Sequence, residues 1–171
     1  MSDRVLDQQG PKCPLRVTPA MVSGLVEVLA LLKDRADVAT IVREVGMESG
    51  LVLDILEACE ALGLVKVDEG DAILTELGQS FSRKRHSGKI RMLRELTKNA
   101  EPFKSIIRYM VEKKEPIPVE QICRDLSLCD DSPESVTMAK SFLLDWLITT
   151  GYLEYDGDAG LFKVKRGVKV S

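Results

Sequence analysis

Apolar residues recur three or four positions apart near the start of the chain, which is the spacing of one face of an α-helix. The stretch TPAMVSGLVEVLALLKDR begins at Thr18, a residue type suited to an N-cap, and continues with Pro19, which suits the first helical turn. Its apolar face runs through Leu29 and is widened by Val26 and Leu31. The pattern therefore predicts an amphipathic helix.

Two more helices and a hairpin are predicted after it. DVATIVREVG has Asp37 as a cap and Gly46 as a stop, and SGLVLDILEACEALG has Ser49 as a cap. The predicted buried face of that third helix comprises Val52, Ile55, Leu56, Cys59 and Leu62. LVKVDEGDAILTELG then places two short apolar runs around a turn rich in Asp and Gly, which is typical of a β-hairpin. Three helices followed by a hairpin predict a helix-turn-helix with a wing.

The second half of the chain repeats this order. Helices are predicted within EPFKSIIRYMVEKK, PVEQICRDLSL and SPESVTMAKSFLLDWLITTG, and YLEYDGDAGLFKVK repeats the hairpin. One shift of 88 residues places Gly63 on Gly151 and Leu64 on Tyr152. An internal duplication explains this register. We therefore predict a mainly α fold with small β-hairpins, built as two tandem winged-helix domains.

The predicted organisation has four parts. They are an N-terminal tail (1–14), a first winged-helix domain (15–81), a basic linker helix (82–100) and a second winged-helix domain (101–168). A chain of 171 residues is long enough for two small cores. The chain has no apolar run long enough for a membrane helix and no apolar signal-peptide core, so we predict a cytoplasmic location.

Cysteine and histidine usage argues against a metal or cofactor. The four cysteines include no CxxC pair, and the one histidine, His86, is far from all of them in sequence. Cys59 and Cys123 fall on apolar helix faces and are predicted core residues. His86 has no nucleophile and orienting carboxylate beside it, so we predict no enzymatic activity, no metal and no cofactor.

Positive charge is concentrated between the two halves. The net charge is −3, yet residues 82–98 hold seven Lys or Arg against the single acid Glu95. The candidate residues for nucleic-acid or anion binding are Arg83, Lys84, Arg85, Lys89, Arg91, Arg94 and Lys98, together with Lys140 from the second half. Three interpretations stay open: a solvated or protein-complementary surface, a phosphate-binding surface for nucleic acid, and a site for lipid or small anions.

Several of these stretches resemble the C-terminal AAA-associated domain, the module appended to ATP-binding subunits of nitrate/sulfonate-type ABC transporters. The resemblance is carried by VSGLVEVLALL, by residues 37–81 and by FLLDWLITTGYLEYDGDAGLFKV, and runs from about Leu15 to Lys165. It implies a regulatory or interaction module beside an ATPase. The chain lacks a Gly-x-x-x-x-Gly-Lys-Ser/Thr phosphate loop, since Gly88 and Lys89 are followed by Ile90, so an ABC-type ATPase partner would act in trans.

The function predicted from these features is that of a non-enzymatic tandem winged-helix regulatory module that binds a protein partner. The alternative is a DNA-binding winged-helix transcriptional regulator with mainly phosphate contacts. Base reading by the third helix of the first domain is disfavoured, because no basic residue lies between Ser49 and Val65. The acids Asp54 and Glu57 of that helix would face phosphates. The identity of the partner, any effector and the oligomeric state do not follow from the sequence.

Overall fold

The computed structural model describes residues 10–170 and is mainly helical, with two small antiparallel sheets. This confirms the prediction of a mainly α fold with small hairpins. The chain divides into two compact units, the first ending at Met92 and the second beginning at Leu93. The four predicted domain boundaries stay predictions, and residues 1–9 of the predicted tail lie outside the described residues.

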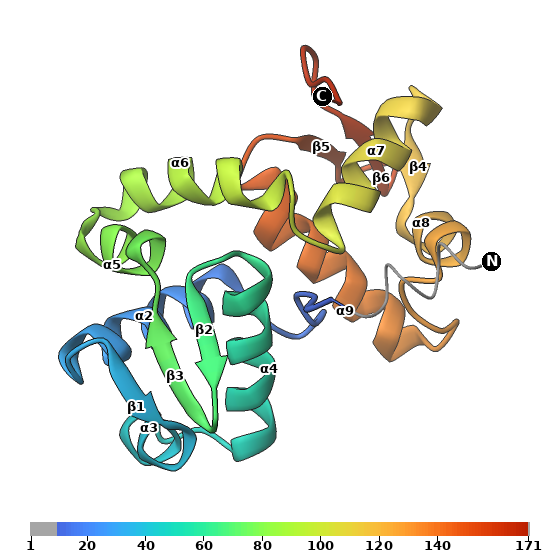
Figure 1. The fold of residues 1–171 in the computed structure, drawn as a ribbon. Coiled ribbons are helices and arrows are strands. Elements are labelled where there is room, and N and C mark those ends of the chain that lie inside the picture. Colours follow the sequence, from blue (N-terminus) through green and yellow to red (C-terminus); the bar gives the residue numbers. More distant parts are fainter. Residues whose placement is uncertain (1–9, 171) are drawn as a thin grey trace. The chain divides into compact units, whose positions relative to one another are not determined.

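Unit 1 is built around its first helix (Figure 1). Its elements are α2 (Pro19–Leu31), β1 (Arg35–Asp37), α3 (Val38–Val45), α4 (Ser49–Ala61), β2 (Val65–Asp68), β3 (Asp71–Leu74) and α5 (Glu76–Arg83). Helix α2 packs against α3, α4 and α5, and α4 lies beside β2. The sheet has the order β1-β3-β2, with β3 in the centre. The core therefore forms where α2 faces the other helices and the central strand.

Two of the predicted helix ends in unit 1 show the expected capping chemistry, whereas Asp37 occupies the N-cap position of α3 without making a side-chain capping hydrogen bond. The Thr18 hydroxyl accepts a hydrogen bond from the Met21 amide at 3.2 Å, and Gly46 ends α3 at φ 67°. The cap of α4 was predicted wrongly. It is Glu48 rather than Ser49, because the two carboxylate oxygens of Glu48 accept from the amides of Gly50 at 2.7 Å and Leu51 at 3.0 Å.

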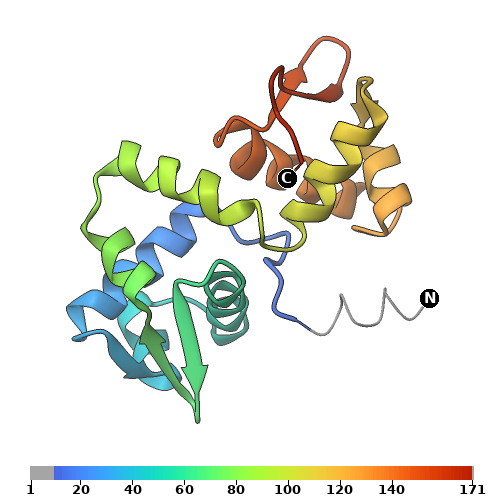
Figure 2. The same cartoon turned by 45° about the horizontal axis from the view of Figure 1, so that its top comes forward.

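Unit 2 has the same order of three helices and a hairpin. Its elements, besides the end of α6, are α7 (Phe103–Lys113), β4 (Ile117–Pro118), α8 (Val119–Leu126), α9 (Pro133–Leu143), the π-helix η1 (Leu144–Ile148), β5 (Leu153–Asp156) and β6 (Leu161–Val164). The sheet order β4-β6-β5 matches that of unit 1. An aromatic cluster fills the core. The centroid of the Phe103 ring lies 5.1 Å from that of Phe142 and 4.9 Å from that of Trp146. Figure 2 shows α7 beside α8 within this unit.

The helix before α7 is α6 (His86–Thr97), which runs across the boundary between the units. The linker helix predicted over residues 82–100 is shorter in the structure. Ser82 and Arg83 complete α5, and Lys84 has an extended backbone with ψ of 152°, so the helical hydrogen bonds are interrupted before α6 begins. The basic segment, residues 82–98, therefore spans two helices and the turn between them.

The predicted repeat register holds for the first hairpin strand, because β2 begins at Val65 and β5 begins 88 residues later at Leu153. The second strand shifts further, since the turn over residues 157–160 is longer than the turn over residues 69–70. Strands β1 and β4 were not predicted. With three and two residues, they are too short to show an alternating pattern, and they are defined by pairing with the central strand of each sheet.

Candidate functional site

The first part of the basic segment is open to solvent. Arg83, Lys84, Arg85 and Arg91 are all exposed. Within residues 10–170, none of these four side chains makes a hydrogen bond, an ion pair or a ring contact. These four residues are the candidates in unit 1 whose positive charge is not paired with any acidic side chain that the structure describes.

Lys89 differs from these four because its side chain is engaged inside unit 1. Its ammonium donates to the Ser23 hydroxyl at 3.1 Å, forms an ion pair with Glu27, and lies 5.6 Å from the centroid of the Phe81 ring. Only 12% of the side chain is exposed. Lys89 thus attaches α6 to α2, and its charge is already compensated.

Arg94 makes three contacts near the start of the second hairpin, all inside unit 2. Its guanidinium donates to the Thr150 carbonyl oxygen at 2.5 Å and lies 4.5 Å from the centroid of the Tyr152 ring. The Tyr152 hydroxyl donates to the Arg94 carbonyl oxygen at 2.5 Å. Gly151 leaves room for this arrangement, since a Cβ there would lie 3.0 Å from an Arg94 nitrogen. Burial raises the pKa of Tyr152, which keeps its hydroxyl protonated as a donor.

The last two predicted residues also have neighbours. Lys98 pairs with Glu95 at 3.0 Å, and the hydrogen bond to Glu95 raises the pKa of Lys98. Lys140 lies with its ammonium 5.2 Å from the centroid of the Tyr155 ring, which is a cation–π geometry. The predicted set is therefore not one surface of equivalent charges: some members support the fold, and others are free.

Residues 12–17 cover the outward side of α4, which was not predicted from the sequence. The Lys12 amide donates to a Glu57 carboxylate oxygen at 3.2 Å, and the Arg16 guanidinium pairs with Asp54 at 2.6 Å. Cys13 and Val17 are buried, with 2% and 1% exposure. The two acids that were expected to face solvent are thus half-buried beneath residues 12–17. An α-helix reads bases with its outward side, so this arrangement disfavours base reading by α4.

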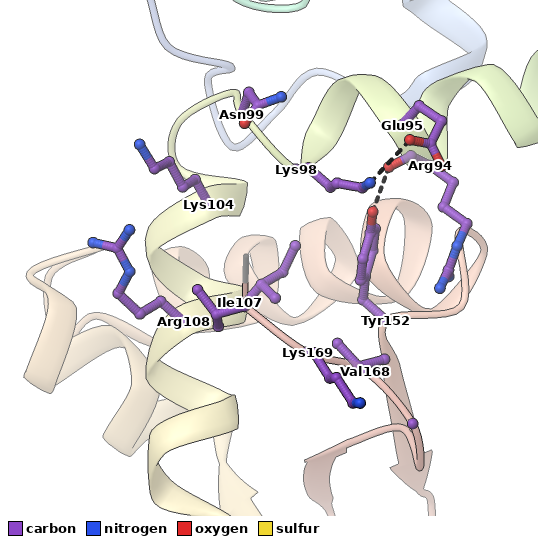
Figure 3. Close-up of a pocket in the computed structure, with 12 residues that line it drawn as sticks. Arg94, Glu95, Lys98, Asn99, Lys104, Ile107, Arg108, Tyr152, Val168 and Lys169 are labelled. Carbon is purple, nitrogen blue, oxygen red and sulfur yellow. Dashed lines mark hydrogen bonds and ion pairs between the residues drawn. The ribbon is translucent and has the colours of Figure 1, made fainter.

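A pocket of about 250 Å³ lies entirely within unit 2 (Figure 3). It is bounded by the end of α6, one side of α7, the first residue before β5 and the chain after β6. Its lining residues are Arg94, Glu95, Lys98, Asn99, Lys104, Ile107, Arg108, Tyr152, Gly167, Val168, Lys169 and Val170. Five of these residues are Lys or Arg and one is acidic, so the pocket has a net positive lining.

Of this lining, the predicted candidate set contained only Arg94 and Lys98, so sequence reasoning missed the cations Lys104, Arg108 and Lys169 as well as Tyr152. One signal was present, because Lys104 and Arg108 are four residues apart in a predicted helix with no acid between them. The contribution of Lys169 could not be found in this way, since it depends on where the chain runs after the hairpin.

The cysteines and the histidine form no reactive cluster. Burial raises the pKa of the Cys13 and Cys59 thiols well above the ordinary value and that of Cys123 to about 12. His86 is exposed at the start of α6. Among the described side chains, no three His, Cys, Asp or Glu residues are grouped so as to hold a metal ion. In residues 10–170, no helix combines the length and apolar character needed to cross a membrane.

The sequence was compared with models of known protein families. The model of the C-terminal AAA-associated domain matches residues 39–156, which is more than half of the sequence and includes parts of both units. The chain therefore belongs to the C-terminal AAA-associated domain family, as the resemblance indicated. The matched range is narrower than the resemblance, since it begins inside α3 and ends with β5. Comparisons with curated proteins and with solved structures found no match.

Proposed function

We propose that this chain is a non-enzymatic, tandem winged-helix module that acts in the cytoplasm by binding a protein partner, an ABC-type ATPase subunit supplied in trans. The observation that carries the proposal is the family match over residues 39–156, because the family is defined by its association with ATPases. The winged-helix assignment is supported by the order of elements. In each unit, two helices precede a third helix, which leads into a hairpin that pairs with a short upstream strand.

The proposal that the module is not an enzyme rests on the chemistry of its side chains. Thiols with raised pKa values are poor nucleophiles at neutral pH, and this applies to Cys13, Cys59 and Cys123. ATP chemistry would come from the partner, since the sequence lacks a phosphate loop.

A protein partner suits the distribution of charge in unit 1. Free cations at Arg83, Lys84, Arg85 and Arg91 lie on the same small unit as the exposed acids Asp68 and Glu69 of the hairpin turn. Opposite charges in separate places favour a partner with a complementary pattern, because they fix orientation and reject wrong partners. A duplex-binding surface would instead present positive charge alone.

The test is direct binding of the whole chain to purified ABC-type ATP-binding subunits from the same organism, measured by sedimentation velocity. A complex is expected, and replacing Arg83, Arg85 and Arg91 together by Glu should weaken it. Lys66→Glu is the matched control, because Lys66 is also exposed in unit 1 but lies outside the basic segment. Failure of every such subunit to form a complex would remove the proposed partner class.

The alternative function, a DNA-binding regulator with mainly phosphate contacts, is favoured by one observation. Arg83, Lys84, Arg85 and Arg91 have no compensating acid among the described residues, and such cations can neutralise phosphates without reading sequence. The occupied outward side of α4 weighs against sequence-specific reading by that helix.

A further inference from the structure

The cations of the unit 2 pocket fall into two groups. Arg94 is held by the Thr150 carbonyl and the Tyr152 ring, and Lys98 is paired with Glu95. Lys104, Arg108 and Lys169 are exposed, and in the part of the chain that the structure describes their side chains make no hydrogen bond, ion pair or ring contact. The first group maintains the shape of the pocket, and the second leaves three positive charges uncompensated around it.

Two of these free charges repel each other. Lys104 and Arg108 are separated by one helical turn of α7, and Figure 3 shows both side chains leaving the same side of that helix. Like charges four residues apart destabilise a helix. A bound anion would remove this repulsion, and a group with two negative charges could contact both side chains at once.

The pocket also has an apolar part. Val168 and the 44% exposed Val170, both from the chain after β6, line the space together with the small accessible parts of Ile107 and Tyr152. An inorganic ion would leave this surface bare. A volume of about 250 Å³ lies just below the range of about 300 to 1,000 Å³ that is usual for ligand sites, so it suits a small metabolite.

We propose that this pocket binds a small organic phosphate monoester. Arg108 and Lys104 contact the phosphate group, Arg108 through two parallel N–H donors, which match the geometry of phosphate oxygens. Lys169 adds a third positive charge from the chain after β6. The organic part of the ligand covers Ile107 and Val168. A phosphate monoester is preferred to a monocarboxylate, because at neutral pH its charge is nearly −2 and the free lining charge is positive at three positions.

This inference is independent of the proposed protein partner, since it concerns unit 2 alone and a ligand of another class. The test is titration of the whole, isotope-labelled chain with phenyl phosphate, followed by backbone amide NMR. Saturable shifts are expected at Lys104, Ile107 and Arg108, with a dissociation constant below about 1 mM. Inorganic phosphate should bind more weakly, and benzoate more weakly still.

Variants separate a built site from general attraction of anions. Arg108→Gln should weaken phenyl phosphate binding about tenfold or more, and Arg108→Lys should restore part of the loss. Arg124→Gln is the matched control, because Arg124 is also exposed in unit 2 but does not line the pocket. Equal losses for Arg108→Gln and Arg124→Gln would overturn the proposal. So would shifts without saturation, or inorganic phosphate binding as tightly as phenyl phosphate.

Discussion

The guanidinium of Arg94 lies 4.5 Å from the centroid of the Tyr152 ring, while the Tyr152 hydroxyl donates a hydrogen bond to the Arg94 carbonyl oxygen. These two residues are 58 positions apart in sequence. The double contact fastens the end of α6 to the start of the second hairpin inside unit 2. It also forms one wall of the proposed phosphate pocket.

Removing the tyrosine hydroxyl should therefore weaken unit 2. Tyr152→Phe is expected to lower the free energy of unfolding by about 0.5 to 1.5 kcal/mol, because the hydrogen bond from the Tyr152 hydroxyl to the Arg94 carbonyl oxygen is lost. Urea unfolding monitored by the fluorescence of Trp146 measures this change, since Trp146 is the one tryptophan of the chain and lies in unit 2. Tyr155→Phe is the control. A cost for Tyr152→Phe no larger than that of the control would contradict the assigned hydrogen bond.

The aromatic cluster should dominate the stability of unit 2. Phe142 is 1% exposed and stacks on Phe103, so Phe142→Ala is expected to cost about 3 to 5 kcal/mol. Met138 lies one turn earlier on α9 with 43% exposure, and Met138→Ala should cost less than about 0.5 kcal/mol. Circular dichroism at increasing urea concentration compares the two. Similar midpoints for both variants would show that the cluster is not the core of this unit.

Two helical glycines should respond to alanine with opposite signs. A Cβ at Gly78 in α5 would lie 2.1 Å from the Leu64 carbonyl oxygen, so Gly78→Ala is expected to destabilise unit 1 by about 1 to 3 kcal/mol. A Cβ at Gly24 in α2 would meet nothing within 4 Å, and Gly24→Ala should stabilise by about 0.5 to 1 kcal/mol. Thermal unfolding of both variants shows whether each substitution raises or lowers the melting temperature. A stabilising Gly78→Ala would mean that α5 does not pack this closely on Leu64, the residue before β2.

The cap of α4 should make stability depend on pH. Hydrogen bonds from the amides of Gly50 and Leu51 lower the pKa of Glu48 below its ordinary value of 4.5. Because the pKa is lower in the folded state, the contribution of this cap is fully present above pH 4.5 and is lost as the pH falls through the folded-state pKa. Carbon-detected NMR titration should place the Glu48 pKa below its ordinary value of 4.5. A Glu48 pKa at or above that value would rule out this cap.

Duplex DNA should bind weakly, without sequence preference and with a steep dependence on salt. Four phosphate contacts from Arg83, Lys84, Arg85 and Arg91 predict a slope of log K against log salt of about −3.6. Replacing Arg83 and Arg85 by Ala should flatten the slope by about 1.8, and Asp54→Ala should not weaken binding. Fluorescence anisotropy with two unrelated duplexes measures this. Tight, selective binding that survives these changes but is lost on replacing Lys140 would contradict this prediction and would place sequence reading in unit 2.

The helices were predictable because their signals are local. Thr18, Gly46 and Ser132 act at single helix ends, and the apolar spacing around Ile55 directly marks a buried face. Leu31 shows where that reasoning fails. It was assigned to the apolar face of α2 but is 83% exposed, because two residues after the buried Leu29 a helix has turned by about 200°.

Some local features, and all features that depend on distant parts of the chain, could not be predicted. The carboxylate cap at Glu48 replaced a more usual serine cap, and the π-helix Leu144–Ile148 leaves no mark in the apolar spacing. The eight candidate cations could be named from sequence, but their separation into engaged and free groups depends on partners such as Glu27 and Thr150. The pocket joins segments more than 50 residues apart, so its lining could not be assembled without the fold.

Residues 12–17, which lie against α4, have a thermodynamic consequence for anything that approaches that helix. A segment attached through a short connection acts as an internal competitor, with an effective concentration on the order of millimolar. An external ligand for Asp54 and Glu57 must first displace this segment. The measured affinity of the ligand is therefore weaker than its intrinsic affinity by the ratio of molecules in which residues 12–17 cover α4 to molecules in which they do not. Competition of this kind needs no second protein, and its strength is set by the few residues between Arg16 and the start of α2.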